Sequence, residues 1–176
     1  MNLNILMTVL NILILAGTLF IAFWAYKSQR THNFNSVKPI LQLDFGDYED
    51  SIFVDLYNNG VGPGIITKIK VTNSNGHIEN DLIAYFKDLP WACNAFTTRL
   101  EGYAISPNCE ICLFETENRD KHKAEIRNIL KDLHIEVEYI DIYNRHMKPL
   151  SEYLDWFKSD PYIRKISAGK KRNNRQ

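Results

Sequence analysis

The residues best suited to chemistry in this sequence are an arginine and a histidine seven positions apart, Arg127 and His134. Seven positions are two helical turns, so both side chains would share one flank of a helix expected at 119–133. In RNA cleavage, a histidine moves the proton and an arginine stabilises the phosphorane charge. With eight arginines and five histidines, about 0.7 such matches are expected by chance. A surface arginine and a histidine at the end of a helix are therefore the alternative.

Other reactive side chains give weaker patterns. Cys109 and Cys112 have a spacing that zinc sites use, but the alternating residues 110–114 predict a strand, which would turn the thiols to opposite faces. No second cysteine pair is present, so we expect two small buried cysteines, no metal and no cofactor. Carboxylates gather around the first expected hairpin, where a solvated loop is the simpler interpretation; they are Asp44, Asp47, Glu49, Asp50 and Asp55. The sequence contains neither a phosphate-binding loop motif nor a nucleophile elbow.

The elements that would position these residues are mostly strands. Apolar alternation and turn residues predict strands at 40–45, 51–58, 65–71, 97–105, 110–117 and 134–143, short helices at 78–91 and 119–133, and a strand or helix at 151–157. The glycine-rich turn at 58–64 predicts that the strands before and after it form an antiparallel meander. The apolar phase slips after Tyr139, which predicts a bulge or burial on both faces. We expect an α+β fold: an N-terminal transmembrane helix, then a strand-rich cytoplasmic domain with one antiparallel sheet or a sandwich and two short helices.

The N-terminal segment has the length of a membrane span. Residues 5–26 are uncharged, and a helix of that length covers about 33 Å, close to the hydrocarbon thickness. Aromatic residues gather at its C-terminal end, as at a membrane interface. Lys27 and Arg30 follow the span and no basic residue precedes it, which predicts an outside N-terminus and a cytoplasmic C-terminal domain at the bacterial inner membrane. A cleaved signal peptide, which usually has a basic start and a small-residue cleavage site, is the alternative.

Polar residues within this segment keep a heptad spacing. Positions that alternate steps of four and three form one seam of a slightly underwound helix; they are Asn4, Thr8, Asn11, Leu15, Thr18, Ala22 and Ala25. Lipid gives no hydrophobic drive for helix association, so helices meet there through small residues and interhelical hydrogen bonds. The seam therefore predicts self-association, and a ring wide enough for water would use it to line a pore. The alternative is that Asn and Thr are tolerated near the span's ends, with Thr hydroxyls bonded to their own backbone.

Charge and cysteine content are the informative features of the rest of the chain. Of 176 residues, 1–26 form the expected span, 27–38 a polar juxtamembrane linker, 39–160 the domain and 161–176 a tail. All 21 acidic residues lie between 38 and 160, where 13 Lys and Arg accompany them. The tail has no acid and six basic residues: Arg164, Lys165, Lys170, Lys171, Arg172 and Arg175. We expect it near an anionic leaflet. Three cysteines, an odd number, favour a reducing compartment over a disulfide framework.

Taken together, the size, the single N-terminal span, the cytoplasmic remainder and Arg127-x6-His134 resemble the small membrane accessory protein of type VI CRISPR loci, which accompanies the RNA-guided RNase effector. The resemblance implies a divergent HEPN-type Arg-x(4–6)-His motif and a ring-like oligomer that forms an inner-membrane pore. It also implies antiviral defence by depolarisation once the RNase partner has found viral RNA. HEPN domains are helical bundles, so the strand-rich domain expected here departs from that pattern.

Three functions stay open on this basis. The first is a pore-forming defence protein, whose partners would be other copies of the chain, membrane lipid, and the RNase effector or its RNA products. The second is a membrane-tethered interaction module without a channel, because the turn DLYNNGVGPGII at 55–66 resembles turns of many small single-span bacterial proteins. The third is a membrane-bound HEPN-like RNase, which would need Arg127 and His134 to converge. No small-molecule substrate is indicated.

Overall fold

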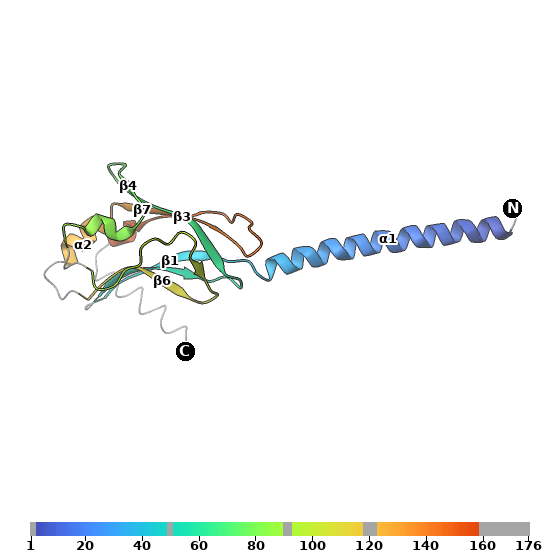
Figure 1. Cartoon of the computed structure of the whole chain (residues 1–176), viewed down its shortest axis with the longest axis horizontal. Helices are drawn as coiled ribbons and strands as arrows, with labels where there is room; N and C mark the ends of the chain where they lie inside the picture. The colour runs from blue at the N-terminus through green and yellow to red at the C-terminus, as the bar shows by residue number, and fades with distance from the viewer. Residues whose placement is uncertain (1–2, 49–50, 90–92, 118–122, 159–176) are drawn as a thin grey trace. The chain divides into compact units, whose positions relative to one another are not determined.

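The computed structural model describes residues 3–48, 51–89, 93–117 and 123–158. The chain divides into two compact units, Met1–Val37 and Lys38–Gln176, and Figure 1 traces it from blue to red. The α-helices are α1 (Leu3–Asn35) and α2 (Lys123–Leu130), and the 3-10 helices are η1 (Leu82–Phe86) and η2 (Leu154–Lys158). The strands are β1 (Leu41–Asp47), β2 (Ile52–Asn58), β3 (Gly64–Asn73), β4 (Ile78–Glu79), β5 (Ala104–Ile105), β6 (Glu110–Thr116), β7 (Leu133–Ile140) and β8 (Leu150–Tyr153).

The first unit is the helix α1, which buries none of its residues. Among the described residues it is one helix long and apolar enough to cross a membrane. The helix continues through the polar residues 27–35, where the sequence indicated a linker. These residues contain neither Gly nor Pro, so nothing in them stops the helix before Pro39.

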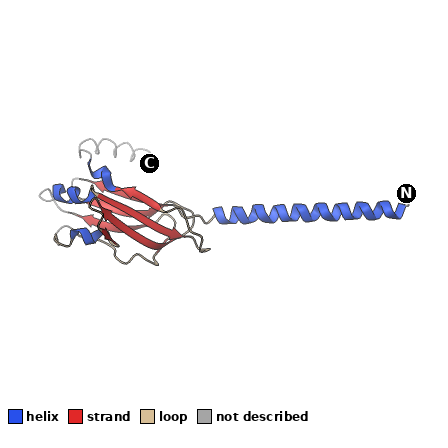
Figure 2. Ribbon diagram, turned by 90° about the horizontal axis from the view of Figure 1, so that it is seen from above, coloured by secondary structure: helices blue, strands red, loops and turns tan. Residues whose placement is uncertain are grey.

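The second unit consists of two antiparallel sheets around one hydrophobic core. The smaller sheet has the order β1-β2-β6, and the larger has the order β4-β3-β7-β8 with β5 beside β3. Every second residue of the central strands faces the core, as Val54 and Leu56 do in one sheet and Ile135 and Val137 in the other. Figure 2 shows the strands lying together, with the short helices gathered at one end of the domain. The expected fold class, α+β with a long apolar helix before a strand-rich domain, is confirmed.

The connection after β2 differs from the prediction. β2 pairs with β1 and β6, whereas β3 pairs with β4, β5 and β7, so residues 59–63 cross from one sheet to the other. The predicted meander across this turn is wrong. Gly60 lies in this crossing and packs tightly against the start of the domain. A Cβ at this position would overlap backbone atoms of Lys38 and Ile40, so the crossing requires a glycine there.

Several predicted elements are shorter in the structure. The expected helix at 78–91 is the strand β4 followed by the 3-10 helix η1, and the helix at 119–133 is described only as α2. Of the strand expected at 97–105, only β5 pairs with a neighbour. These segments carry the right apolar pattern, but the backbone partners that decide their conformation lie far away in sequence.

The phase slip after Tyr139 has a different cause from the one expected. β7 alternates regularly and ends at Ile140, so the slip marks the end of the strand. The irregularity lies in the partner strand β3, where the register shifts between Ile66 and Lys68. The bulge is thus opposite the predicted position and lets both strands keep their apolar residues inward.

The two ends of the domain differ in character. Lys38–Ile40 and the turns 59–63, 106–109 and 141–149 lie where β2 and β7 end and β1, β3 and β6 begin; we call this the loop end. The opposite end carries η1, α2 and η2, and we call it the helix end.

Asn58 holds the loop end together. Its side chain is fully buried and makes four hydrogen bonds to backbone groups. Its Oδ1 accepts from the amides of Ile40 (3.1 Å) and Gly60 (2.9 Å). Its Nδ2 donates to the carbonyls of Gly62 (2.8 Å) and Ile105 (2.9 Å). One amide therefore joins the start of the domain, the crossover turn and β5, with every donor and acceptor position used.

Replacing Asn58 by Ala should destabilise the domain by about 3 kcal/mol, because three buried backbone groups and the part-buried amide of Ile40 lose their partner. The matched control is Asn73→Ala, which removes two exposed hydrogen bonds to the amides of Asn75 and His77 and should cost about 1 kcal/mol or less. Chemical unfolding of the full chain in detergent measures both. Equal losses for the two variants would contradict this role of Asn58.

Candidate functional site

Arg127 takes part in an ion pair that fastens α2 to the end of β1. Its Nε lies 2.7 Å from Oδ2 of Asp47 and its Nη2 lies 2.8 Å from Oδ1, so the pair is bidentate. The Asp47 side chain is 1% exposed and the Arg127 side chain is 23% exposed. Four residues earlier, Lys123 donates to the backbone oxygen of Tyr48 at 2.6 Å. The arginine thus neutralises a nearly buried carboxylate and anchors the helix.

His134 lies in β7 rather than on the helix. Its Nε2 is 2.9 Å from Oγ of Ser151, and its ring stacks on Tyr153 with the centroids 4.2 Å apart. Because α2 ends at Leu130, the prediction that Arg127 and the histidine share one helical flank is wrong. The arginine reaches the smaller sheet, whereas the histidine contacts β8 of the larger sheet. RNA cleavage by this pair stays a prediction and would need side chains of two chains to meet.

Cys112 has a neighbour that the Cys-x-x-Cys spacing does not reveal. Its Sγ lies 3.7 Å from the backbone oxygen of Ala95, and Sγ of Cys93 lies 3.1 Å from the same oxygen. All three cysteines are free, and Cys109 is exposed. Burial raises the pKa of Cys112 to about 12 and also raises the pKa of Cys93, so both are protonated thiols at neutral pH. Within the described ranges, no group of three or more His, Cys, Asp or Glu residues could hold a metal ion.

The carboxylates of the first hairpin separate into different environments. Asp47 pairs with α2, whereas Glu49 and Asp50 lie outside the described residues. Asp44 and Asp55 are cross-strand partners on the outer face of the smaller sheet. A hairpin register drawn from the sequence would have placed these two aspartates opposite each other.

Asp55 lies in an acidic hollow of about 360 Å³ on this outer face. The lining residues are Asp44, Phe53, Asp55, Glu110, Cys112 and Glu115. Burial raises the pKa of Asp55 to about 7, the nearby Glu110 carboxylate adds to the rise, and a hydrogen bond from Cys112 opposes it. No sequence pattern indicates this environment, because β6 contributes half of the lining and its pairing with β2 is long-range.

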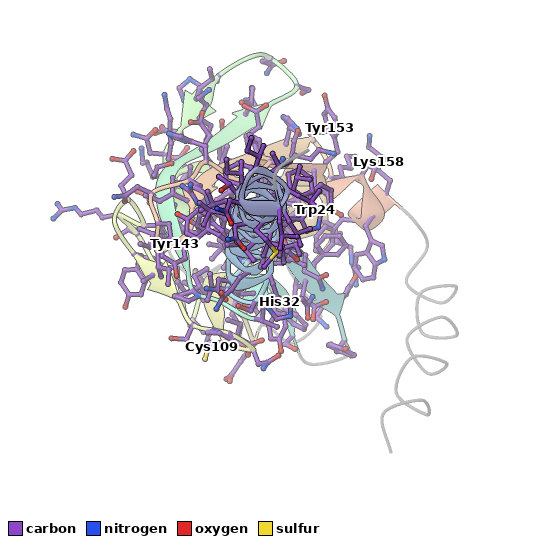
Figure 3. The ribbon with its side chains drawn as sticks, turned by 90° about the vertical axis from the view of Figure 1, so that its right-hand side faces the viewer. Trp24, His32, Cys109, Tyr143, Tyr153 and Lys158 are labelled. Carbon is purple, nitrogen blue, oxygen red and sulfur yellow. The ribbon has the colours of Figure 1, made fainter. Side chains whose placement is uncertain are left out.

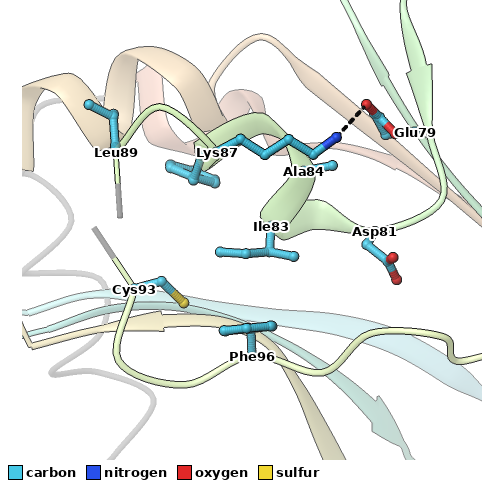
Figure 4. A pocket seen from close by; sticks show the side chains of 9 residues that line it. Glu79, Asp81, Ile83, Ala84, Lys87, Leu89, Cys93 and Phe96 are labelled. Carbon is cyan, nitrogen blue, oxygen red and sulfur yellow. Dashed lines mark hydrogen bonds and ion pairs between the residues drawn. The ribbon is translucent and has the colours of Figure 1, made fainter. Parts of the chain in front are cut away.

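A second hollow lies between η1 and residues 93–96 (Figure 4). Its volume is also about 360 Å³, and its lining residues are Glu79, Asp81, Ile83, Ala84, Phe86, Lys87, Leu89, Cys93 and Phe96. Lys87 and Glu79 already pair at 3.2 Å on its rim. The lining combines apolar side chains from η1 and residues 93–96 with the charged side chains of Glu79, Asp81 and Lys87, a mixture that suits an amphipathic segment of a binding partner.

The seam of α1 contains two kinds of polar side chain. The Thr8 hydroxyl donates to the backbone oxygen of Asn4 and the Thr18 hydroxyl to that of Leu15, both at 2.8 Å. The Asn11 amide has no hydrogen bond to the described residues; Figure 3 looks along α1 with its side chains drawn as sticks. The threonine hydroxyls are therefore satisfied within one helix, whereas the side-chain amides of Asn4 and Asn11 have no partner among the described residues. Of these two amides, only that of Asn11 lies inside the uncharged stretch 5–26.

The remaining seam positions, Leu15, Ala22 and Ala25, are exposed on the helix surface. The tail residues Arg164, Lys165, Lys170, Lys171, Arg172 and Arg175 lie outside the described part of the chain. Compared with known proteins, the chain matches no family model and no curated protein. The geometry of its own residues is therefore what bears on function.

Removing the Arg127 side chain should destabilise the domain by about 3 kcal/mol, because it leaves the buried Asp47 carboxylate without its partner. His134→Ala should cost less than about 1 kcal/mol, because it removes one partly exposed hydrogen bond and a ring contact. Unfolding of the full chain measures both, alongside RNA incubation with each variant. Metal-independent cleavage by the wild type that both variants lose, with folding and assembly intact, would contradict a purely structural role.

Asp55 should make stability fall as pH rises. Its pKa is 3.8 unfolded and about 7 folded, so the folded state binds the extra proton between these values, and stability is lost as pH rises through this window. Asp55→Asn should therefore exceed the wild type in stability at pH 8, and the difference should vanish near pH 4. The matched control is Asp132→Asn, which removes a carboxylate from an exposed position. A difference for Asp55→Asn that is constant with pH would show that Asp55 ionises normally.

Proposed function

We propose that this chain is a single-span membrane protein that self-associates through α1 and carries its β-sheet domain as a cytoplasmic interaction module. The observation that carries the proposal is a long apolar helix, none of whose residues is buried, with one unsatisfied amide in its apolar stretch. Such a surface needs lipid around it, and such an amide needs a partner within the lipid.

The span accounts for most of this helix. Residues 5–26 match the hydrocarbon thickness, and the polar residues 27–35 extend the helix beyond it. Lys27 and Arg30 favour the cytoplasm for the side that carries the domain. The three reduced cysteines agree with that compartment.

Self-association follows from the seam. At 100° per residue, its seven positions stay within about 100° of one another around the helix, so one neighbouring helix can cover them all. Asn11 lies near the centre of this set, where a hydrogen bond to another copy would satisfy its amide. The small side chains of Ala22 and Ala25 let helix backbones approach closely at the other end of the seam.

The domain supports binding more than catalysis. Arg127 is engaged by Asp47, His134 contacts a different strand, and the hollow beside η1 has a mixed lining of apolar and charged side chains. A small domain with such a hollow, held at a membrane, is suited to recruiting a partner to that surface.

A pore is the second candidate, and Asn11 is the observation that favours it. A ring with this amide facing inward would have a polar group in an otherwise apolar channel, as the resemblance to the type VI CRISPR accessory protein implies. The RNA-guided RNase effector or its RNA products would then be the trigger. Depolarisation of the inner membrane would be the output.

Asn11→Leu should weaken association in vesicles about fivefold, because loss of one interhelical hydrogen bond in lipid costs about 1 kcal/mol. Thr18→Val should have little effect, because the Thr18 hydroxyl already bonds to Leu15. Leu13→Ile and Phe20→Leu, on the opposite face, should also have little effect. Energy transfer between labelled full-length copies measures association.

The same variants separate the two candidates. In cells that express the chain with its trigger, a pore predicts depolarisation by the wild type and none by Asn11→Leu. Association that depends on Asn11 without depolarisation supports the module alone. If Asn11→Leu associates as the wild type does, the seam is incidental and self-association through it is wrong.

A further inference from the structure

We propose that the outer face of the smaller sheet binds the basic tail of the same chain, residues 161–176. The inference concerns the domain alone, so it does not depend on the membrane span or on self-association through α1. We call this surface the acidic face. It is defined by four carboxylates and two aromatic rings: Asp44, Asp55, Glu110, Glu115, Tyr48 and Phe53.

The charge of the acidic face has one sign. Strands β1, β2 and β6 contain no lysine or arginine. Asp44 and Asp55 are directly opposite each other in the β1–β2 ladder, an arrangement that costs stability between like charges. None of the four carboxylates forms an ion pair with another described residue. A cationic segment on this face would therefore offset a repulsion that the described part of the domain leaves in place.

The aromatic rings add a second feature that suits basic side chains. Tyr48 and Phe53 stack with their centroids 5.9 Å apart and their planes at 19°. Both rings lie over Gly46, where a Cβ would overlap them. Lysine and arginine pack their aliphatic stems on such rings and place their charge over the ring face or beyond it. The hollow of about 360 Å³ beside Phe53 and the carboxylates gives room for such side chains.

The tail is the segment of this chain whose charge complements the acidic face. It contains six basic residues and no acidic one. It also starts close by, because Trp156 and Phe157 of η2 lie 5.3 Å and 5.9 Å from the Phe45 ring of β1. Phe45 directly follows Asp44 in the strand at the edge of the acidic face.

The length of the tail lets it reach every carboxylate of the acidic face. Residues 159–176 span up to about 59 Å when extended, whereas three neighbouring strands are only about 10 Å across. A segment attached at the edge of its own binding surface has a high effective concentration there. Several weak, partly exposed ion pairs are then enough to hold it.

The first experiment uses the full chain in phosphatidylcholine nanodiscs with at most one copy in each disc, at low salt. A carbodiimide activates a carboxylate and leaves as its urea when a lysine amine attacks, so an amide forms only where the two groups meet. Mass spectrometry should find Lys165, Lys170 or Lys171 joined to carboxylates of the acidic face. Absence of these links, or links to carboxylates elsewhere in equal yield, would overturn the proposal.

The second experiment measures how fast trypsin cuts the tail after Arg172 in the same discs. Glu110→Gln with Glu115→Gln should speed this cleavage about fivefold, because the docked tail loses two ion pairs. The matched control is Glu136→Gln with Glu138→Gln, which makes the same charge change on β7 of the larger sheet. It should leave the rate unchanged, and Trp fluorescence checks the fold of both variants.

Two results of the second experiment would contradict docking on the acidic face. One is an equal cleavage rate in the wild type and both double variants. The other is protection of the tail only in discs that contain anionic lipid, which would assign the tail to the membrane surface instead. Both results would leave the proposed function intact.

Discussion

The fold of the domain depends on four hydrogen bonds between one buried side-chain amide and backbone groups. Asn58 ends β2, and its side chain reaches the first residues of the domain, both glycines of the crossover turn, and β5. Without it, the amide of Gly60 and the carbonyls of Gly62 and Ile105 would be buried without this partner, at a cost of about 1–3 kcal/mol each. The two sheets are therefore joined at this end by a polar cluster, whereas their faces are held by apolar packing. At the opposite end, Arg127 and Asp47 have the corresponding role and close α2 over β1.

This arrangement separates structural polar groups from those left for function. The arginine that the sequence singled out for chemistry is used in the fold, and Asn58, which no motif marks, is the residue on which the loops depend. The polar groups still without a partner in one chain include Asn11 in α1, and the apolar groups still uncovered include those at the loop end. The proposed membrane-bound assembly would give the Asn11 amide a partner in another copy of the chain and surround the apolar surface of α1 with lipid.

Local pattern was enough to predict the apolar helix, the strands β1, β2, β3, β6 and β7, and the fold class, because each is set by periodicity over fewer than about 20 residues. Local pattern failed to predict the features that depend on contacts between residues far apart in sequence. The turn 58–64 looked like a hairpin because nothing local shows that its two strands join different sheets. Arg127 looked free because Asp47 lies 80 residues away. The environment of Asp55 and the approach of Cys93 to Cys112 depend on β6, whose neighbours only the folded register reveals.

The central claim is that α1 holds more than one copy of the chain together in lipid. It is tested most directly by the mass of the wild-type full-length chain extracted with its surrounding lipid and weighed intact by native mass spectrometry. The account predicts one discrete multiple of the chain mass that persists on dilution. A monomer at every concentration, with the domain folded and the helix in lipid, would contradict it.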